Sequence, residues 1–176
     1  MAKIYNFKTQ LELGQKAEQD FLTIYHEKLT PSEDRAYDFL LPDGRKLELK
    51  TDFYGEQRSK NFFMERWSVF EKKKPGGAWQ SRDKGTDVLV YFYPDTGSYY
   101  VFDNLTELIH ELDHYVQTTG LAMSLVKNKG YNGGGYKIPR EVLKDVYRKF
   151  SKGDTALCGE ESGGRTTGKP TGRNAR

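Results

Sequence analysis

Hydrophobic and polar residues alternate over residues 37–50, on both sides of the turn-forming sequence Pro-Asp-Gly at residues 42–44. Proline and glycine between two such runs predict a β-hairpin. A turn centred on the aspartate places Asp38 opposite Glu48, and the period-two alternation of a strand puts Lys50 on the face of Glu48. The other face of the predicted hairpin is apolar and contains Phe39, Leu41, Leu47 and Leu49.

Three further segments have features of helices. Apolar residues recur every three or four positions over residues 9–28, which predicts a first amphipathic helix with Glu18 near the border of its buried stripe. A second helix is predicted to begin at Asn104, which forms a capping box with the glutamate three residues later, and to stop at Gly120. A third helix is predicted over residues 140–150, because the proline before it suits a helix start.

Aromatic and apolar runs between these segments predict additional strands over residues 61–70, 86–93 and 98–102. The basic residues 72–77 and the glycine-rich residues 127–137 are predicted loops. The order of helix, strands, helix, loop and helix indicates an α/β domain with a mixed central β-sheet flanked by helices.

A change of composition at residue 151 divides the chain of 176 residues. Residues 1–150 have a globular composition and are expected to form one domain. Residues 151–176 consist mainly of Gly, Thr, Ser, Lys and Arg, so they lack the apolar side chains of a core. We expect this second segment to be a disordered basic tail.

Composition also limits the classes of function. The single cysteine, Cys158, excludes an intramolecular disulfide and a cysteine-rich zinc site. The sequence has no apolar run long enough for a membrane span and no signal-peptide pattern at its start, so a cytoplasmic protein without a membrane partner is expected. A net charge of +3 permits a polyanionic partner without requiring one.

The charged face of the predicted hairpin points to chemistry. Two carboxylates that face each other, Asp38 and Glu48, repel and resist ionising together, so this arrangement favours a compensating cation. A divalent metal is the natural candidate. The alternative interpretation is a solvated face on which Glu48 and Lys50 form an incidental ion pair.

Asp38, the sequence Glu48-Leu49-Lys50 and the upstream Glu18 together resemble the active-site signature of the PD-(D/E)xK nuclease superfamily. The resemblance covers about residues 11–93, and it is closest to phage-type endonucleases and Holliday-junction resolvases. Tyr37 stands where the motif has its proline. The resemblance implies a restriction-endonuclease-like fold, branched or duplex DNA as the substrate, and, for a phage protein, action in the host cytoplasm.

The resemblance also assigns roles. Asp38, Glu48 and the carbonyl of Leu49 would bind Mg²⁺ or Mn²⁺, and Glu18 would hold the ion through a water or bind a second one. Lys50 would orient or activate the attacking water. Because a resolvase needs two active sites, a homodimer is one arrangement that this resemblance leaves open. A nucleic-acid-binding module of the same fold without catalysis is the main alternative.

A competing motif occurs at residues 110–114, where His110, Glu111 and His114 match the zinc-protease pattern HExxH, with Glu141 as a third potential ligand. The apolar stripe of the surrounding helix places these histidines on its opposite, polar side. Asp113 adds a charge where that pattern normally has none. A zinc metalloprotease is therefore the third hypothesis.

Other charged positions receive structural interpretations. Glu65, in an aromatic strand, is either an outward-facing charge, which is favoured, or a group that supports the site from behind its ligands. Asp52 is predicted to be a solvated strand end, and Asp87 a cap for the preceding loop. Basic residues gather in the predicted loops, including residues 72–74, and the backbone amides of residues 133–135 could approach a phosphate backbone closely.

Overall fold

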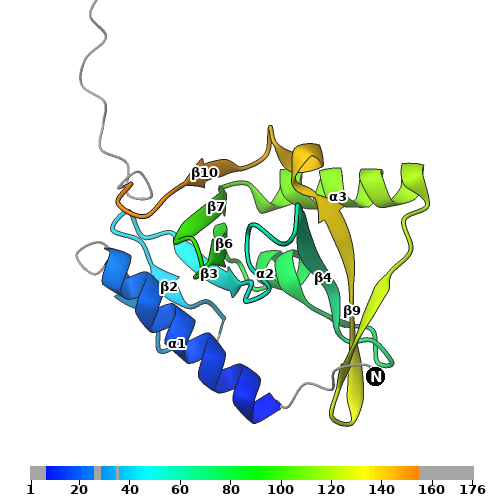
Figure 1. The fold of residues 1–176 in the computed structure, drawn as a ribbon, viewed down its shortest axis with the longest axis horizontal. Coiled ribbons are helices and arrows are strands. Elements are labelled where there is room, and N and C mark those ends of the chain that lie inside the picture. The colour runs from blue at the N-terminus through cyan, green and yellow to red at the C-terminus, as the bar shows by residue number, and fades with distance from the viewer. Residues whose placement is uncertain (1–6, 26–28, 35, 155–176) are drawn as a thin grey trace, which may run out of the picture.

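The computed structural model describes residues 7–25, 29–34 and 36–154 (Figure 1). The end of the first predicted helix, residues 26–28, and most of the predicted tail, residues 155–176, lie outside the described residues. The helices are α1 (Phe7–Tyr25), α2 (Gly77–Asp83), α3 (Leu105–Thr119) and the short 3₁₀ helix η1 (Arg140–Leu143). None of the helices in this part of the chain is long and apolar enough to span a membrane.

A mixed sheet forms the centre of the fold, as predicted for an α/β protein. Its strands, in spatial order, are β1 (Thr30–Pro31), β2 (Phe39–Leu40), β3 (Lys46–Thr51), β6 (Val88–Tyr93), β7 (Ser98–Phe102) and β10 (Arg148–Phe150). Strands β3 and β6 are parallel, whereas the other neighbours are antiparallel. Between β3 and β6 the chain leaves this sheet to form β4, β5 and α2.

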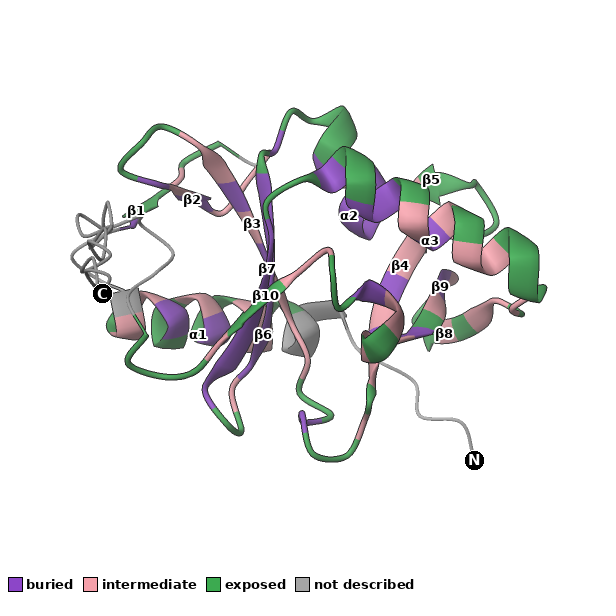
Figure 2. Cartoon of the chain, turned by 90° about the horizontal axis from the view of Figure 1, so that it is seen from above, coloured by how far each residue is buried: buried purple, intermediate pink, exposed green. Residues whose placement is uncertain are grey.

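A second, antiparallel sheet stands beside the first and was not predicted. Its strands, in spatial order, are β5 (Lys74–Pro75), β4 (Asn61–Val69), β9 (Tyr131–Pro139) and β8 (Ser124–Asn128). Figure 2 shows α1 on one side of the six-stranded sheet, and α2, α3 and the four-stranded sheet on the other.

Side chains from both faces of β6 are buried, because alternate residues enter two different cores. Val88, Val90 and Phe92 pack with Phe21 of α1, whereas Leu89 and Tyr91 belong to the core beneath α2, α3 and β4. A strand covered on both faces explains the continuous apolar sequence that predicted it.

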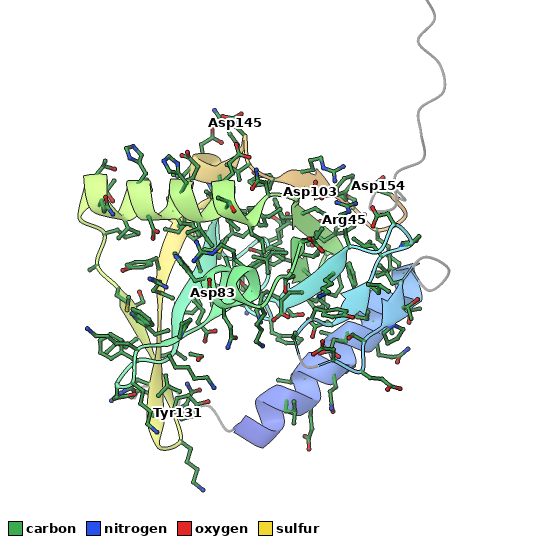
Figure 3. The ribbon with its side chains drawn as sticks, turned by 180° about the vertical axis from the view of Figure 1, so that it is seen from behind. Arg45, Asp83, Asp103, Tyr131, Asp145 and Asp154 are labelled. Carbon is green, nitrogen blue, oxygen red and sulfur yellow. The ribbon has the colours of Figure 1, made fainter. Side chains whose placement is uncertain are left out.

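The helix predicted over residues 140–150 is wrong. Only residues 140–143 are helical, and residues 148–150 pair with β7 as the edge strand β10. Aromatic packing favours this path, because Phe150 stacks on Tyr99 with ring centroids 5.2 Å apart. Asp103 accepts hydrogen bonds from Arg148 and from Arg45 of the β2–β3 turn, which joins β10 to the hairpin (Figure 3).

The loop predicted over residues 127–137 is also wrong, because most of these residues form β8 and β9. Glycine makes this strand possible where β9 packs on β4. A Cβ atom at Gly135 would lie 2.7 Å from the ring of Phe63 and 2.7 Å from the carbonyl oxygen of Met64. Close packing between the two strands therefore requires glycine at this position.

The predicted second helix is confirmed, including both of its ends. The side chain of Asn104 accepts a hydrogen bond from the backbone N–H of Glu107 at 3.1 Å. Gly120 ends α3 in the left-handed conformation, with φ of 63°. The strands predicted over residues 61–70 and 98–102 are confirmed as β4 and β7.

Candidate active site

The register of the β2–β3 hairpin is the predicted one. Phe39 pairs with Leu47, and the backbone N–H of Asp38 donates to the carbonyl of Leu47 at 2.9 Å. Asp38 is therefore opposite Glu48. The four predicted apolar side chains, Phe39, Leu41, Leu47 and Leu49, are all buried.

Asp38 directly precedes β2, and its side chain, instead of a backbone carbonyl, accepts the next hydrogen bond from β3. Its Oδ2 accepts a hydrogen bond from the N–H of Leu49 at 2.7 Å. In an extended strand the N–H and C=O of one residue point to the same side. The carbonyl of Leu49 therefore points to the edge of β3 on which the Asp38 carboxylate lies.

Glu48 and Lys50 form an ion pair on the face of β3 opposite to the buried Leu47 and Leu49. The Nζ atom of Lys50 donates to Oε1 of Glu48 at 2.5 Å, and the Glu48 side chain is only 16% exposed. Because this carboxylate is largely shielded from water, the ammonium of Lys50 is its direct charge partner.

Two more carboxylates approach this pair from other elements. Glu18 comes from α1, and its pKa is raised by burial and by the nearby Glu48, with Lys50 opposing the shift. Glu65 comes from β4, and its pKa is raised by burial and also by Glu48, whereas Lys50 and a backbone N–H from Gly77 oppose the shift. We call Glu18, Asp38, Glu48 and Glu65 the carboxylate cluster.

The prediction that Glu65 faces outward is wrong. Its carboxylate lies against the glycines at the start of α2 and in β9: a Cβ atom at Gly76 would be 2.5 Å from Oε2, and one at Gly133 would be 3.7 Å from Oε1. The missing side chain of Gly76 therefore leaves the space that Glu65 fills. The position of Glu65 could not be predicted because that sheet was not.

Asp38 has the most strongly shifted pKa in the carboxylate cluster. Burial, followed by the charge of Glu48, raises its pKa from 3.8 to about 6, although the N–H of Leu49 and the ammonium of Lys50 both lower it. Desolvation lowers the pKa of Lys50, but the charges of Glu48, Glu65 and Asp38 outweigh this and raise it. The cluster therefore has more negative charge than its single ammonium balances.

The donor set of the cluster suits a hard divalent cation, since carboxylate and carbonyl oxygens are the ligands that Mg²⁺ and Mn²⁺ prefer. In the described part of the chain, no three His, Cys, Asp or Glu side chains already stand close enough together to hold an ion. Lys50 instead provides the positive charge beside Glu48.

The histidines of the HExxH sequence lie on the exposed face of α3, as their spacing predicted. His110 is 77% exposed and contacts its neighbour Glu111 at 3.2 Å. The rings of His110 and His114 are parallel, with centroids 6.4 Å apart. Glu141 pairs instead with Lys144 at 2.8 Å.

Asp52 and Asp87 both make specific hydrogen bonds. Asp87 accepts from the N–H of Lys46 at 2.8 Å and so fixes the start of β3. Asp52 accepts from the N–H of Tyr54 at 2.7 Å and from the hydroxyl of Tyr91 at 3.4 Å. Asp52 therefore follows the last residue of β3, at the predicted strand end, and its carboxylate in addition organises the turn that comes next.

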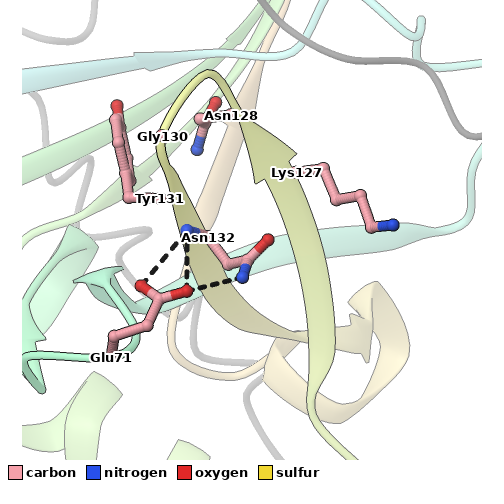
Figure 4. Close-up of a pocket in the computed structure, with 6 residues that line it drawn as sticks. All are labelled: Glu71, Lys127, Asn128, Gly130, Tyr131 and Asn132. Carbon is pink, nitrogen blue, oxygen red and sulfur yellow. Dashed lines mark hydrogen bonds between the residues drawn. The ribbon is translucent and has the colours of Figure 1, made fainter.

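Two surface cavities lie apart from the carboxylate cluster, because neither is lined by any of its residues. One, of about 280 Å³, is at the tip of the β8–β9 hairpin (Figure 4). There Glu71 accepts hydrogen bonds from the backbone N–H and the side-chain amide of Asn132, at 3.1 Å and 2.5 Å. These bonds attach the hairpin tip to the segment after β4.

A scan against protein-family models and searches of curated proteins and solved structures found no match to this chain. Its function is therefore inferred from the geometry and chemistry of the carboxylate cluster.

Proposed function

We propose that this protein is a metal-dependent nuclease that hydrolyses phosphodiester bonds in DNA. The observation that carries the proposal is the gathering of Asp38, Glu48 and Lys50 on one hairpin, with Glu18 beside them from α1. These residues carry the resemblance to PD-(D/E)xK nucleases, in which Tyr37 stands in place of the motif's proline. Their excess of buried negative charge supplies a physical reason to bind a divalent cation.

Asp38, Glu48 and the carbonyl of Leu49 would hold Mg²⁺ or Mn²⁺, with Glu18 as an outer or second-ion ligand. The bound ion would lower the pKa of a water and stabilise negative charge on the phosphate. Asp38 would bind the ion as a carboxylate, so its raised pKa makes binding compete with protons near pH 6.

Lys50 has two roles in this proposal. Without a metal its ammonium neutralises Glu48. When Glu48 binds a cation, that ammonium becomes available to orient the attacking water and to stabilise charge that develops on the phosphate oxygens. Glu65, whose charge also acts on Lys50, would keep the ammonium in the site during this exchange.

The test is cleavage of supercoiled plasmid, linear duplex, single-stranded DNA and a four-way junction in Mg²⁺ or Mn²⁺. Asp38→Asn and Lys50→Met are expected to lower the rate by at least about 100-fold, because each removes a group that acts in the transition state. Asp43→Asn, in the exposed turn of the same hairpin, is the matched control and should retain full activity. Equal rates for all four proteins would overturn the proposal.

A non-catalytic nucleic-acid-binding module is the second candidate. The closed ion pair between Glu48 and Lys50 favours it, because an ammonium already occupies the place of a cation. Salt-dependent DNA binding without cleavage in any divalent metal would select this candidate over the nuclease.

A further inference from the structure

Two neighbouring aromatic side chains are exposed directly after the strand that contains Lys50. Phe53 is 49% exposed and Tyr54 is 64% exposed, in the segment of residues 52–60 that connects β3 with β4 (Figure 1). Exposed adjacent rings are unfavourable in water, so they suggest a contact surface. We call this pair the aromatic step.

Hydrogen bonds hold the backbone beneath the aromatic step in place. The N–H of Asp52 donates to the carbonyl of Phe92 at 2.9 Å, which extends the β3–β6 pairing by one residue. The Asp52 carboxylate then binds the N–H of Tyr54 and the hydroxyl of Tyr91. The two rings are therefore presented from an ordered turn that is attached to the central strand β6.

The following residues anchor the other side of the turn. Gly55 adopts φ of 101°, and the N–H of Glu56 donates to Asp95 at 3.2 Å. The Glu56 carboxylate is buried and accepts from the hydroxyls of Tyr100 and Thr96 at 2.6 Å and 2.8 Å. This anchoring leaves the side chains of Phe53 and Tyr54 outside the core.

Two cations follow the aromatic step in the same segment. Arg58 and Lys60 are both exposed, and neither side chain has an ion pair or hydrogen bond with another residue in the described part of the chain. Exposed rings beside unpaired cations are the combination that binds single-stranded nucleic acid: bases stack on the rings, and phosphates contact the cations.

The aromatic step is close to the carboxylate cluster along the chain. Phe53 is three residues after Lys50, so their Cα atoms are at most about 11 Å apart. A strand that enters the site could therefore place a neighbouring nucleotide on the rings.

We propose that the aromatic step binds unpaired bases of the DNA whose backbone enters the carboxylate cluster, with Arg58 and Lys60 contacting its phosphates. This inference rests on the proposed nuclease function and specifies its substrate: DNA with a single-stranded segment next to the cleaved phosphate. Duplex DNA is disfavoured because its base faces are already covered by stacking.

The experiment measures binding without cleavage, in the Asp38→Asn background and in EDTA. Fluorescence anisotropy compares a labelled single-stranded oligonucleotide, the same oligonucleotide with abasic positions, and a matched duplex. Replacing Phe53 and Tyr54 together with leucine keeps apolar area but removes both rings. Phe70→Leu, at another exposed aromatic residue, is the matched control.

The double variant is expected to bind the single strand about 100-fold more weakly, because each ring contributes one stacked base. Its binding to the duplex should be nearly unchanged. Abasic positions should weaken binding by the protein that retains both rings but not by the double variant, since the two changes remove the same contact. Arg58→Gln with Lys60→Gln should make the slope of log K against log salt for the single strand less steep by about 1.4.

Equal losses on single strand and duplex, no loss on either, or no DNA binding at all would overturn the inference. So would concentration-dependent dimers that dissociate in the double variant, because the rings would then be a self-association surface. The nuclease proposal can fail independently of this one. If the rings bind single strands selectively but no metal supports cleavage, the inference about the aromatic step holds and the nuclease proposal fails. If cleavage and binding are unchanged when both rings are removed, the nuclease proposal holds and this inference fails.

Discussion

The Nζ atom of Lys50 lies 2.5 Å from Oε1 of Glu48, two residues earlier in the same strand. Both side chains lie on one face of β3, and the charges of Asp38 and Glu65 also act on the ammonium. The protein's own cation therefore balances part of the carboxylate cluster. In the proposed nuclease, a divalent ion competes with Lys50 for Glu48, so the charge balance of the cluster controls both metal binding and stability.

Asp38→Asn is expected to stabilise the folded protein although it lowers the cleavage rate. The folded pKa of Asp38, about 6, is above its ordinary value of 3.8, so the folded state binds the proton more tightly than the unfolded chain. Stability therefore decreases as pH rises between these two values. Removing the charge should raise the free energy of unfolding by about 1 to 3 kcal/mol at pH 7, with little effect below pH 4.

Urea unfolding at both pH values measures this difference. The amide can still accept the hydrogen bond from Leu49, so the hairpin should be retained. A variant that is less stable at pH 7 than the wild type would contradict the prediction.

Metal affinity should depend on pH through the same carboxyl group. Below about pH 6, Asp38 must lose a proton to bind the ion, so the affinity for Mn²⁺ should fall about tenfold for each further pH unit. Calorimetric titrations in buffers of different ionisation enthalpy would detect the released proton. An affinity for Mn²⁺ that stays constant from pH 5 to pH 7 would exclude Asp38 as a ligand.

Glu65→Gln is expected to lower the cleavage rate by about tenfold, since it weakens the electrostatic hold on Lys50. Gly76→Ala tests the position of Glu65 in a second way, because the added methyl group would displace its carboxylate. Its Cβ atom would be 2.5 Å from the Glu65 carboxylate, whereas the extended backbone of Gly76 tolerates alanine.

Both variants should lower the rate more than they lower stability, because the side chain of Glu65 can move aside. Gly14→Ala is the control, since nothing lies within 4 Å of the added Cβ atom. Wild-type rates for both Glu65→Gln and Gly76→Ala would exclude Glu65 from the mechanism.

Glu56→Gln is expected to destabilise the fold by about 2 to 4 kcal/mol at neutral pH. Burial alone would raise the pKa of Glu56, but hydrogen bonds from Lys149, Tyr100 and Thr96 lower it from 4.5 to about 2. A lowered folded pKa contributes stability that is complete above pH 4.5 and lost as pH falls towards 2.

The gap in unfolding free energy between wild type and Glu56→Gln should therefore narrow in acid. Glu141→Gln removes an exposed ion pair with Lys144 and should change stability by less than about 0.5 kcal/mol. A similar effect from the two substitutions would contradict the role assigned to Glu56.

His110→Ala together with His114→Ala should leave DNA cleavage unchanged. The His110 side chain is 77% exposed, on a face of α3 away from the buried stripe. Elemental analysis of the purified wild type should find no zinc that this double variant loses. A zinc content that is lost in the double variant would support the metalloprotease hypothesis instead.

Local patterns were sufficient wherever one turn or one helix end set the geometry. The β2–β3 turn determines which residues face each other, and the period of two then assigns every side chain to a face, so the positions of Asp38, Glu48 and Lys50 on the hairpin follow from the order of residues. The ends of α3 were equally local, because Asn104 and Gly120 act within a single helical turn.

The remaining features depend on contacts between distant segments. Residues 127–137 resemble a loop in composition, and they form β8 and β9 only because β4 offers a partner strand against which glycines can pack. Residues 148–150 likewise become a strand through pairing with β7. Neither pairing leaves a periodic signal in the chain.

For the candidate site, the hairpin motif was therefore predictable from the sequence alone, since its register follows from adjacent chain. The groups that surround and bury this motif could be identified only from the tertiary structure. Glu65 joins the carboxylate cluster because β4 of the second sheet brings its carboxylate within electrostatic range of Glu48 and Lys50, and the burial that raises the pKa of Asp38 comes from elements packed around the hairpin. Neighbouring residues determine which groups share a face, but only the packed fold determines their solvation and the charges that surround them.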